Sequence, residues 1–353
     1  MAQELQPLMR RLAEWTAPEG TAITSVYLDA RPEASGNRPG ERTAGIILKD
    51  RLQAIEKSLL PRGPGLDSFR VDRDRIERAV AEATPAADGL AIFSCGAADL
   101  FEVVESGVPF DTKVVYQELG ALSPPAALAD EFEPAVVAVA ATNTVRVFSV
   151  RMGTLKESAG KDEKSIHFQK RRTGGLSQER YQRHIEKHRT DFAKEAAQVI
   201  ARVVEEDGAT RVVLSGDEVA IPLLLDALPR SVSEKLVGEG VRTHIRAPKE
   251  EVGEDVAAIL ELAEEESSRA VADALVAEVR KDALGVAGAD PTRRALEAGQ
   301  VDVLVMLDGY EPIEVRDEAT RLAIATSATV EVVPEHEGLA SLGGIGAILR
   351  WRW

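Results

Sequence analysis

Residues 170–181 read KRRTGGLSQERY, which joins a basic run to a Gly-Gly pair and to the first turns of a helix. Glycine has no Cβ, so the backbone at Gly174 and Gly175 can adopt positive φ and approach another surface closely. The cations on either side of the pair indicate that this surface carries phosphate. The segment therefore predicts a tip that is inserted against RNA.

The helix that follows is predicted to have two faces. Apolar side chains recur at helical spacing along one face, at Tyr181, Ile185, Phe192, Ala196, Val199 and Val203. The other face is polar and carries Arg180, Arg183, His184, Lys187 and Lys194. Ser177 is expected to cap the helix by accepting from a free backbone N–H. The candidate RNA-binding residues are Lys170, Arg171, Arg172, Gly174, Gly175, Ser177, Gln178, Arg180, Arg183 and Lys187.

The charge of the chain is unevenly distributed. A net charge of −16 argues against nucleic-acid binding over most of the surface. Residues 164–189 nevertheless hold eight Lys or Arg and two Glu, which makes them +6 and leaves −22 on the rest. An acidic body with one basic segment suits a protein that engages RNA at a single place. A basic helix face that is solvated and has no partner is the alternative.

Length and composition predict a folded protein of several domains. The 353 residues exceed the size at which one core stops growing, so two or three domains are expected. The single cysteine, Cys95, has no disulfide partner, lies in an apolar run and lacks a nearby His or basic cluster, so a buried thiol in a reducing cytosol is expected rather than a catalytic one. Residues 1–15 lack a signal-peptide core, and no run reaches membrane-spanning length. We expect a soluble, cytoplasmic protein with no membrane partner.

The hydrophobic pattern predicts an α/β protein with three domains, over residues 1–130, 131–266 and 267–353. In the first domain we expect strands at 24–28, 89–95 and 112–116, a helix at 44–60 and a flexible loop at 32–40. Pro124-Pro125 and the acidic residues 130–133 predict a linker.

The central domain is predicted to open with a β-hairpin and to continue with strand–helix alternation. The expected elements are the hairpin 135–150 with a turn at Thr142-Asn143, a polar segment at 156–175, the long helix, a strand at 211–216 and a helix at 219–227. A long acidic helix is expected over 248–281. The third domain is expected to contain a helix at 291–298 and strands at 301–307, 329–333 and 347–350.

Several site types are disfavoured by the residues themselves. There is no phosphate-binding loop, and Gly343-Gly344-Ile345-Gly346 precedes a strand, which favours a tight turn over a dinucleotide site. His184 and His188 have the i, i+4 spacing of zinc ligands, but the Glu between them is one place late and no third ligand is evident. A ribonuclease H-like nuclease needs clustered carboxylates, and the hairpin 135–150 has none. We expect no metal and no cofactor.

At the Gly-Gly loop the chain resembles the class I peptide-release factors of archaea and eukaryotes and their paralogue Pelota. Gly174-Gly175-Leu176-Ser177 followed by Arg180-Tyr181 is similar to the family's GGQ loop and the start of its long helix. Four further segments match in the same order: 89–93, 213–216, 295–302 and 342–350, the last reading LGGIGAILR. The resemblance implies a three-domain architecture with a central ribonuclease H-like domain that carries the Gly-Gly loop, and a small C-terminal α/β domain.

Two departures from the family bear on activity. The Gln of GGQ, which in release factors helps to place the attacking water, is Leu176 here, and a Leu side chain has neither donor nor acceptor. The first domain shows no codon-reading Asn-Ile-Lys-Ser signature, and its corresponding helix reads Ala44-Gly45-Ile46-Ile47-Leu48-Lys49. Codon-directed peptide release is therefore not expected, and the chain is not expected to be an enzyme.

The altered loop resembles the bacterial branch of the family and, within it, the Balon-type ribosome hibernation factors. That resemblance implies a stress-response protein that binds ribosomal RNA in the A site of the bacterial ribosome and reaches the peptidyl-transferase centre. It also implies elongation factor Tu as a possible partner. Two alternatives stay open: a peptidyl-tRNA hydrolase or ribosome rescue factor that uses Gln178, and an interaction protein that has kept the fold and lost the ribosome.

Overall fold

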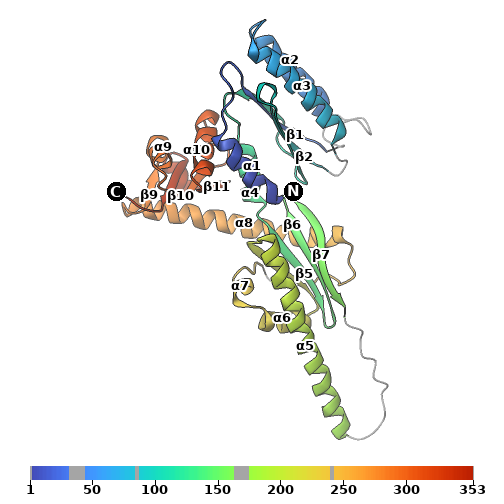
Figure 1. Ribbon diagram of the computed structural model, residues 1–353. Helices are drawn as coiled ribbons and strands as arrows, with labels where there is room; N and C mark the ends of the chain where they lie inside the picture. Colours follow the sequence, from blue (N-terminus) through green and yellow to red (C-terminus); the bar gives the residue numbers. More distant parts are fainter. Residues whose placement is uncertain (1, 32–43, 84–86, 163–174, 239–241, 353) are drawn as a thin grey trace. The chain divides into compact units, whose positions relative to one another are not determined.

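The computed structural model describes residues 2–31, 44–83, 87–162, 175–238 and 242–352, and Figure 1 shows the course of the chain. Its residues form two compact units. One unit is built from residues 1–131 together with 267–353, and the other from residues 132–266. The predicted loop at 32–40 lies outside the described residues.

The N-terminal part of the first unit is an antiparallel sheet of order β3-β2-β1-β4 with helices packed against it. The predictions of strands at 24–28, 89–95 and 112–116 and of a helix at 44–60 are confirmed. The elements are α1 (Ala2–Glu14), β1 (Ile23–Asp29), α2 (Ala44–Ser58), α3 (Pro64–Glu82), β2 (Gly89–Cys95), β3 (Leu100–Ser106) and β4 (Lys113–Gln117). The core joins the sheet to α2 and α3 through fully buried side chains such as Val26, Leu52, Phe69 and Ile92.

The predicted linker at Pro124-Pro125 is wrong, because these residues lie in the first turn of helix α4 (Ser123–Glu131). Proline is tolerated there since the first backbone N–H groups of a helix have no intrahelical acceptor. Pro125, Ala126 and Leu128 are buried. The segment therefore packs as part of the first unit up to its boundary at Glu131.

The second unit is built on a four-stranded sheet of order β7-β6-β5-β8. The strands are β5 (Ala135–Ala141), β6 (Thr144–Arg151), β7 (Thr154–Asp162) and β8 (Arg211–Gly216). The first three form an antiparallel meander, while β8 lies parallel to β5, as the strand–helix alternation predicts. Residues 154–162 are thus an edge strand, so the predicted polar segment at 156–175 begins as part of the sheet.

Both faces of this central sheet are covered by helices, an α/β arrangement consistent with the central domain that the resemblance implies. Helices α5 (Gly175–Asp207) and α6 (Ala220–Ala227) pack on one face, against alternate side chains of β5, β6 and β8. The beginning of α8 (Lys249–Arg280) covers the other face, where Val252 and Val256 contact Phe148. The short helix α7 (Arg230–Ser233) follows α6. Burial on both faces makes this sheet a rigid support for α5.

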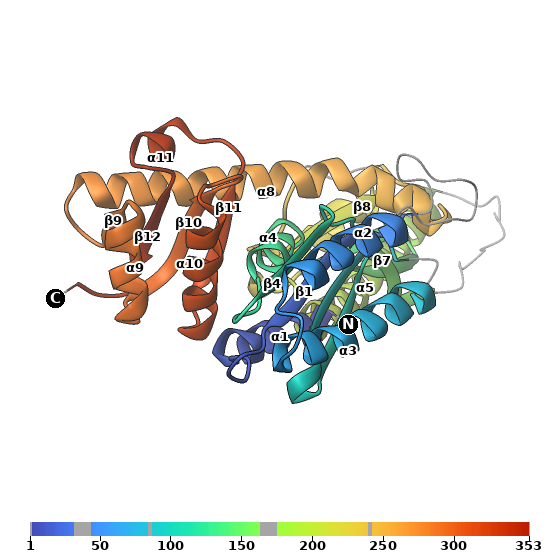
Figure 2. The ribbon, with the colours of Figure 1, turned by 90° about the horizontal axis from the view of Figure 1, so that it is seen from above.

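The C-terminal part of the first unit is a mixed sheet of order β11-β10-β12-β9. Figure 2 shows this sheet between α8 on one side and α9 and α10 on the other. Its elements are β9 (Gly285–Ala287), α9 (Ala289–Glu297), β10 (Val301–Leu307), α10 (Ile313–Ala325), β11 (Thr329–Val333), α11 (Glu337–Ser341) and β12 (Ile345–Leu349). Gly343 and Gly344 have φ of 96° and 75°, so they form the tight turn that the sequence predicts.

The two longest helices, α5 and α8, have 33 and 32 residues. Either is long enough to cross a bilayer. In both, however, charged residues break up the apolar sequence. Within the described part of the chain, no helix combines the length and the apolar character that a membrane span requires.

Candidate functional site

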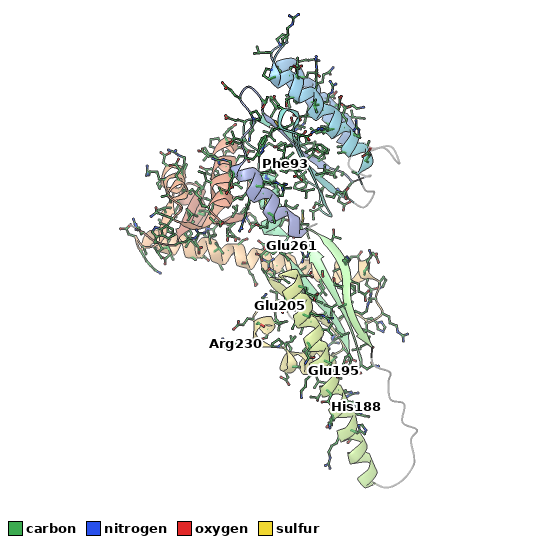
Figure 3. All side chains as sticks on the ribbon, in the orientation of Figure 1. Phe93, His188, Glu195, Glu205, Arg230 and Glu261 are labelled. Atoms are coloured by element: carbon green, nitrogen blue, oxygen red, sulfur yellow. The ribbon has the colours of Figure 1, made fainter. Side chains whose placement is uncertain are left out.

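Helix α5 extends far beyond the sheet that supports it. At 1.5 Å per residue its 33 residues span about 50 Å. Over its described side chains, from residue 182, the first buried one is Phe192, and none of residues 182–191 is buried. Figure 1 shows this half of α5 running past the end of the sheet, and in Figure 3 the labelled His188 lies on it. The helix is therefore an anchored rod with one end projecting from the second unit.

The sequence explains where the anchor begins. Phe192, Ala196, Ile200 and Val203 recur at helical spacing and are 4% exposed or less, packed against β5, β6 and β8. Before Phe192 the only aliphatic side chain among residues 182–191 is Ile185, which is half-buried. The predicted apolar face is thus confirmed over the second half of the helix, and the first half has little apolar surface to hold it against the sheet.

Two of the predicted RNA-binding residues are placed with their side chains, and both lie on the projecting half. Arg183 and Lys187 are exposed and one helical turn apart, so they lie on the same side of α5. Among the described residues, Lys187 makes no hydrogen bond or ion pair. Nothing in the fold of the described residues requires a cation at this position, which leaves it available to a partner.

The other predicted contacts are only partly described. Lys170, Arg171, Arg172 and Gly174 lie outside the described residues. Gly175, Ser177, Gln178 and Arg180 belong to the backbone of α5, which begins at Gly175. The prediction that Ser177 is the N-cap is therefore wrong, because a residue two places into the helix already has helical neighbours on both sides.

His184 and His188 stack on each other on the projecting half of α5. Their ring centroids are 4.4 Å apart, and the ring planes are inclined by 18°. Among the described residues, neither takes part in a group of three or more His, Cys, Asp or Glu with metal-binding geometry. Imidazole rings stacked face to face also do not direct their nitrogens at one ion. Both rings lie on the half of α5 that also carries Arg183 and Lys187.

Polar groups elsewhere in the second unit brace its structure. Arg146 on β6 holds Glu157 on β7 through two hydrogen bonds of 3.0 and 2.9 Å and donates to the carbonyls of Ile245 and Ala247. The guanidinium lowers the pKa of the Glu157 carboxyl, and the carboxylate raises the pKa of Arg146. Arg211, 7% exposed, is paired with Glu133 at 3.2 Å and with Glu264. Each of these charges is paired within the fold.

The first unit contains a buried carboxylate that sequence analysis did not single out. Asp72 on α3 is fully buried and accepts from Thr24 Oγ1 (3.0 Å), Ser94 Oγ (2.7 Å) and the Gly96 backbone N–H (2.6 Å). Burial raises the pKa of this carboxyl, although these hydrogen bonds and Arg75 act in the opposite direction. It fixes the turn after β2 to the first turns of α3. Its only signal in the sequence is an acidic residue at an apolar position of a helix.

Comparison with known proteins places the central part of the chain. Residues 121–261 match the sequence model of bacterial archaeo-eukaryotic release factor family 10. A search of the curated proteins found no match. Solved structures that resemble the chain include the archaeal translation termination factor aRF1, with 19% identity over 99% of this chain and 98% of that one, and a TM-score of 0.30.

Two further solved structures show a similar degree of likeness. Ribosome-bound archaeal Pelota, in a model with ABCE1, has 15% identity over 100% of this chain and 94% of that one, with a TM-score of 0.46. Dom34 from S. cerevisiae has 12% identity over 75% of this chain and 81% of that one, with a TM-score of 0.45. At such low identities and TM-scores the family assignment rests on the sequence match. Residues 121–261, which include the hairpin, the Gly-Gly loop and α5, thus resemble the bacterial archaeo-eukaryotic release factor family.

Proposed function

We propose that this protein is a ribosome-binding translation factor that occupies the A site of the bacterial ribosome and places its Gly-Gly loop near the peptidyl-transferase centre. The observation that carries the proposal is the family match over residues 121–261, because that segment contains both the loop and the projecting half of α5. A helix that is anchored at one end and exposed at the other is suited to carrying a loop away from its own domain.

The cations of the segment supply the affinity. Lys170, Arg171 and Arg172 precede the loop, and Arg183 and Lys187 follow it on the helix. Cations that neutralise phosphates release condensed counterions, which makes binding tight at low salt and independent of base sequence. The net charge of −16 opposes contact over the rest of the surface, so the protein would meet ribosomal RNA through this segment.

Occupancy without peptide release follows from position 176. An attacking water needs a hydrogen-bonding group to hold it, and the Leu176 side chain offers none. Gln178 is a poor substitute, since both residues belong to α5 and two helical positions differ by about 200° around the axis. We therefore propose a hibernation factor that responds to stress by holding ribosomes idle, with elongation factor Tu as a partner that could deliver it.

Co-sedimentation with purified bacterial 70S ribosomes over a salt series tests the proposal. The informative variant reverses three charges, Lys170→Glu, Arg171→Glu and Arg172→Glu. The control reverses three others, Arg202→Glu, Arg230→Glu and Lys249→Glu, whose side chains are 60% exposed or more. Salt-sensitive binding that the first variant loses and the control retains supports the proposal. Absence of binding at low salt, or equal loss in both variants, refutes it.

A second assay distinguishes a peptidyl-tRNA hydrolase from a factor that occupies the ribosome without releasing peptide. Peptidyl-tRNA in stalled ribosome complexes is incubated with the wild type and with Gln178→Ala, and peptide release is measured. We expect no release from either protein. Release by the wild type that disappears in Gln178→Ala would show an enzyme.

A further inference from the structure

The stacked pair His184–His188 is not needed for the core of the second unit. His184 is exposed and His188 is half-buried, and both precede Phe192, the first buried side chain of α5. Their rings lie nearly parallel with centroids 4.4 Å apart. The pair occupies a place that is exposed to a partner of the projecting helix.

The charges around the pair come from the same stretch of α5. Arg183, Lys187 and Arg189 are adjacent to the two histidines in sequence, Glu186 lies between them, and Asp191 lies one turn beyond His188. Lys187 follows His184 by three residues, so the two share one side of the helix. The pair therefore continues the cationic strip formed by Arg183 and Lys187.

Imidazole is the side chain whose charge changes between pH 5 and pH 8. A phosphate at the ring edges stabilises the charged form of an imidazole. Binding of a phosphate there is thus linked to proton uptake.

We propose that His184 and His188 form a phosphate-contacting site on the projecting half of α5, which takes up protons when an RNA backbone binds. The inference rests on the proposed function and adds to it a dependence on pH. Ribosome binding is expected to strengthen as the pH falls from 7.5 to 6.0.

A metal ion bridging the two histidines would give binding a pH dependence of the opposite sign. Metal ligation requires neutral imidazole, so metal-dependent binding weakens as the pH falls. Contact with phosphate requires the charged form, so it strengthens. The direction of the pH effect alone distinguishes the two uses of the pair.

The test compares the wild type with His184→Gln/His188→Gln and with the control His244→Gln. The control removes an exposed histidine of the same unit that lies outside α5. Dissociation constants are measured at pH 7.5 and 6.0 at one salt concentration, with two probes: purified 70S ribosomes and single-stranded poly(U). If RNA binding raises the proton affinity of one imidazole about ten-fold, the protein's affinity for RNA is about four-fold higher at pH 6.0 than at pH 7.5. Each histidine contributes this factor.

We expect a four-fold or greater increase for the wild type and the control, and at most a small one for the double variant. An equal pH response in all three proteins overturns the inference, and so does weaker binding at pH 6.0 that the double variant abolishes. If the wild type binds poly(U) in this way and fails to bind ribosomes, the site is upheld while the proposed function fails. If the wild type binds neither probe, both fail.

Discussion

Replacing both Arg183 and Lys187 by Gln tests whether the projecting half of α5 contacts RNA. Both side chains are exposed and one turn apart, and neither belongs to the core of the second unit. Each cation that neutralises a phosphate contributes about 0.7 to 0.9 to the slope of log affinity against log salt concentration. The double variant should therefore have a slope smaller by about 1.4 to 1.8.

The same slope sets the loss of affinity. Relative to 1 M salt, where counterion release contributes little, two lost contacts weaken binding at 0.1 M salt by about 25- to 60-fold. Dissociation constants from co-sedimentation with 70S ribosomes between 0.05 and 0.3 M salt, a range of about six-fold, measure both quantities. Arg202→Gln/Arg230→Gln removes the same charge from positions outside the strip and controls for net charge. An unchanged slope in the Arg183/Lys187 variant would refute RNA contact along this helix.

Four further outcomes are expected. Leu176→Gln restores a hydrogen-bonding group at the loop, so peptide release from stalled complexes should rise above the wild-type background if the loop reaches the peptidyl-transferase centre. Phe192→Ala opens a cavity beneath α5 and should lower the free energy of unfolding by about 3 to 5 kcal/mol in urea titrations. Arg211→Met removes the cation that is paired with Glu133 and Glu264 and should cost about 3 kcal/mol, whereas Glu133→Gln, at the exposed side of the same cluster, should cost less than about 1 kcal/mol. Burial raises the folded-state pKa of Asp72 above its unfolded value, so ionisation of this carboxyl opposes folding. The free energy of unfolding of the wild type, relative to that of Asp72→Asn, should therefore fall as the pH is raised from about 3.5 to 6. A difference between the two proteins that does not change with pH would contradict this.

Periodicity in the sequence predicted the strands whose side chains are buried on both faces. The runs at 135–141 and 211–216 are continuous and apolar because helices cover both sides of their sheet. The polar strand 154–162 was missed because it lies at the sheet edge, where one row of backbone groups is unpaired and Lys and Glu are common. Helix α4 was missed because Pro124-Pro125 is read as a break, whereas the first turn of a helix accepts proline.

The candidate site was predictable in its composition and less so in its geometry. Basic residues around the Gly-Gly pair and the apolar spacing from Phe192 onward are local properties, so one sequence suffices to find them. The point at which α5 extends past the sheet depends on the lengths of β5 and β6. These strands pair with each other and lie in a different part of the sequence from α5. Likewise, the burial of Asp72 depends on Thr24 and Ser94, which only the folded sheet brings together.

The division of α5 into an anchored and a projecting half explains how one substitution can change function without changing the fold. The anchored half, from Phe192 to Val204, is held by a sheet that is itself covered on its second face, so the helix axis is fixed independently of the loop at its start. Residue 176 lies near the opposite end of the helix. On the proposed function, a change from Gln to Leu there removes the group that could hold a water. Selection could thus convert a releasing factor into a silent occupant of the same site through the loop alone, and the response of Leu176→Gln in the release assay measures how far that conversion can be reversed.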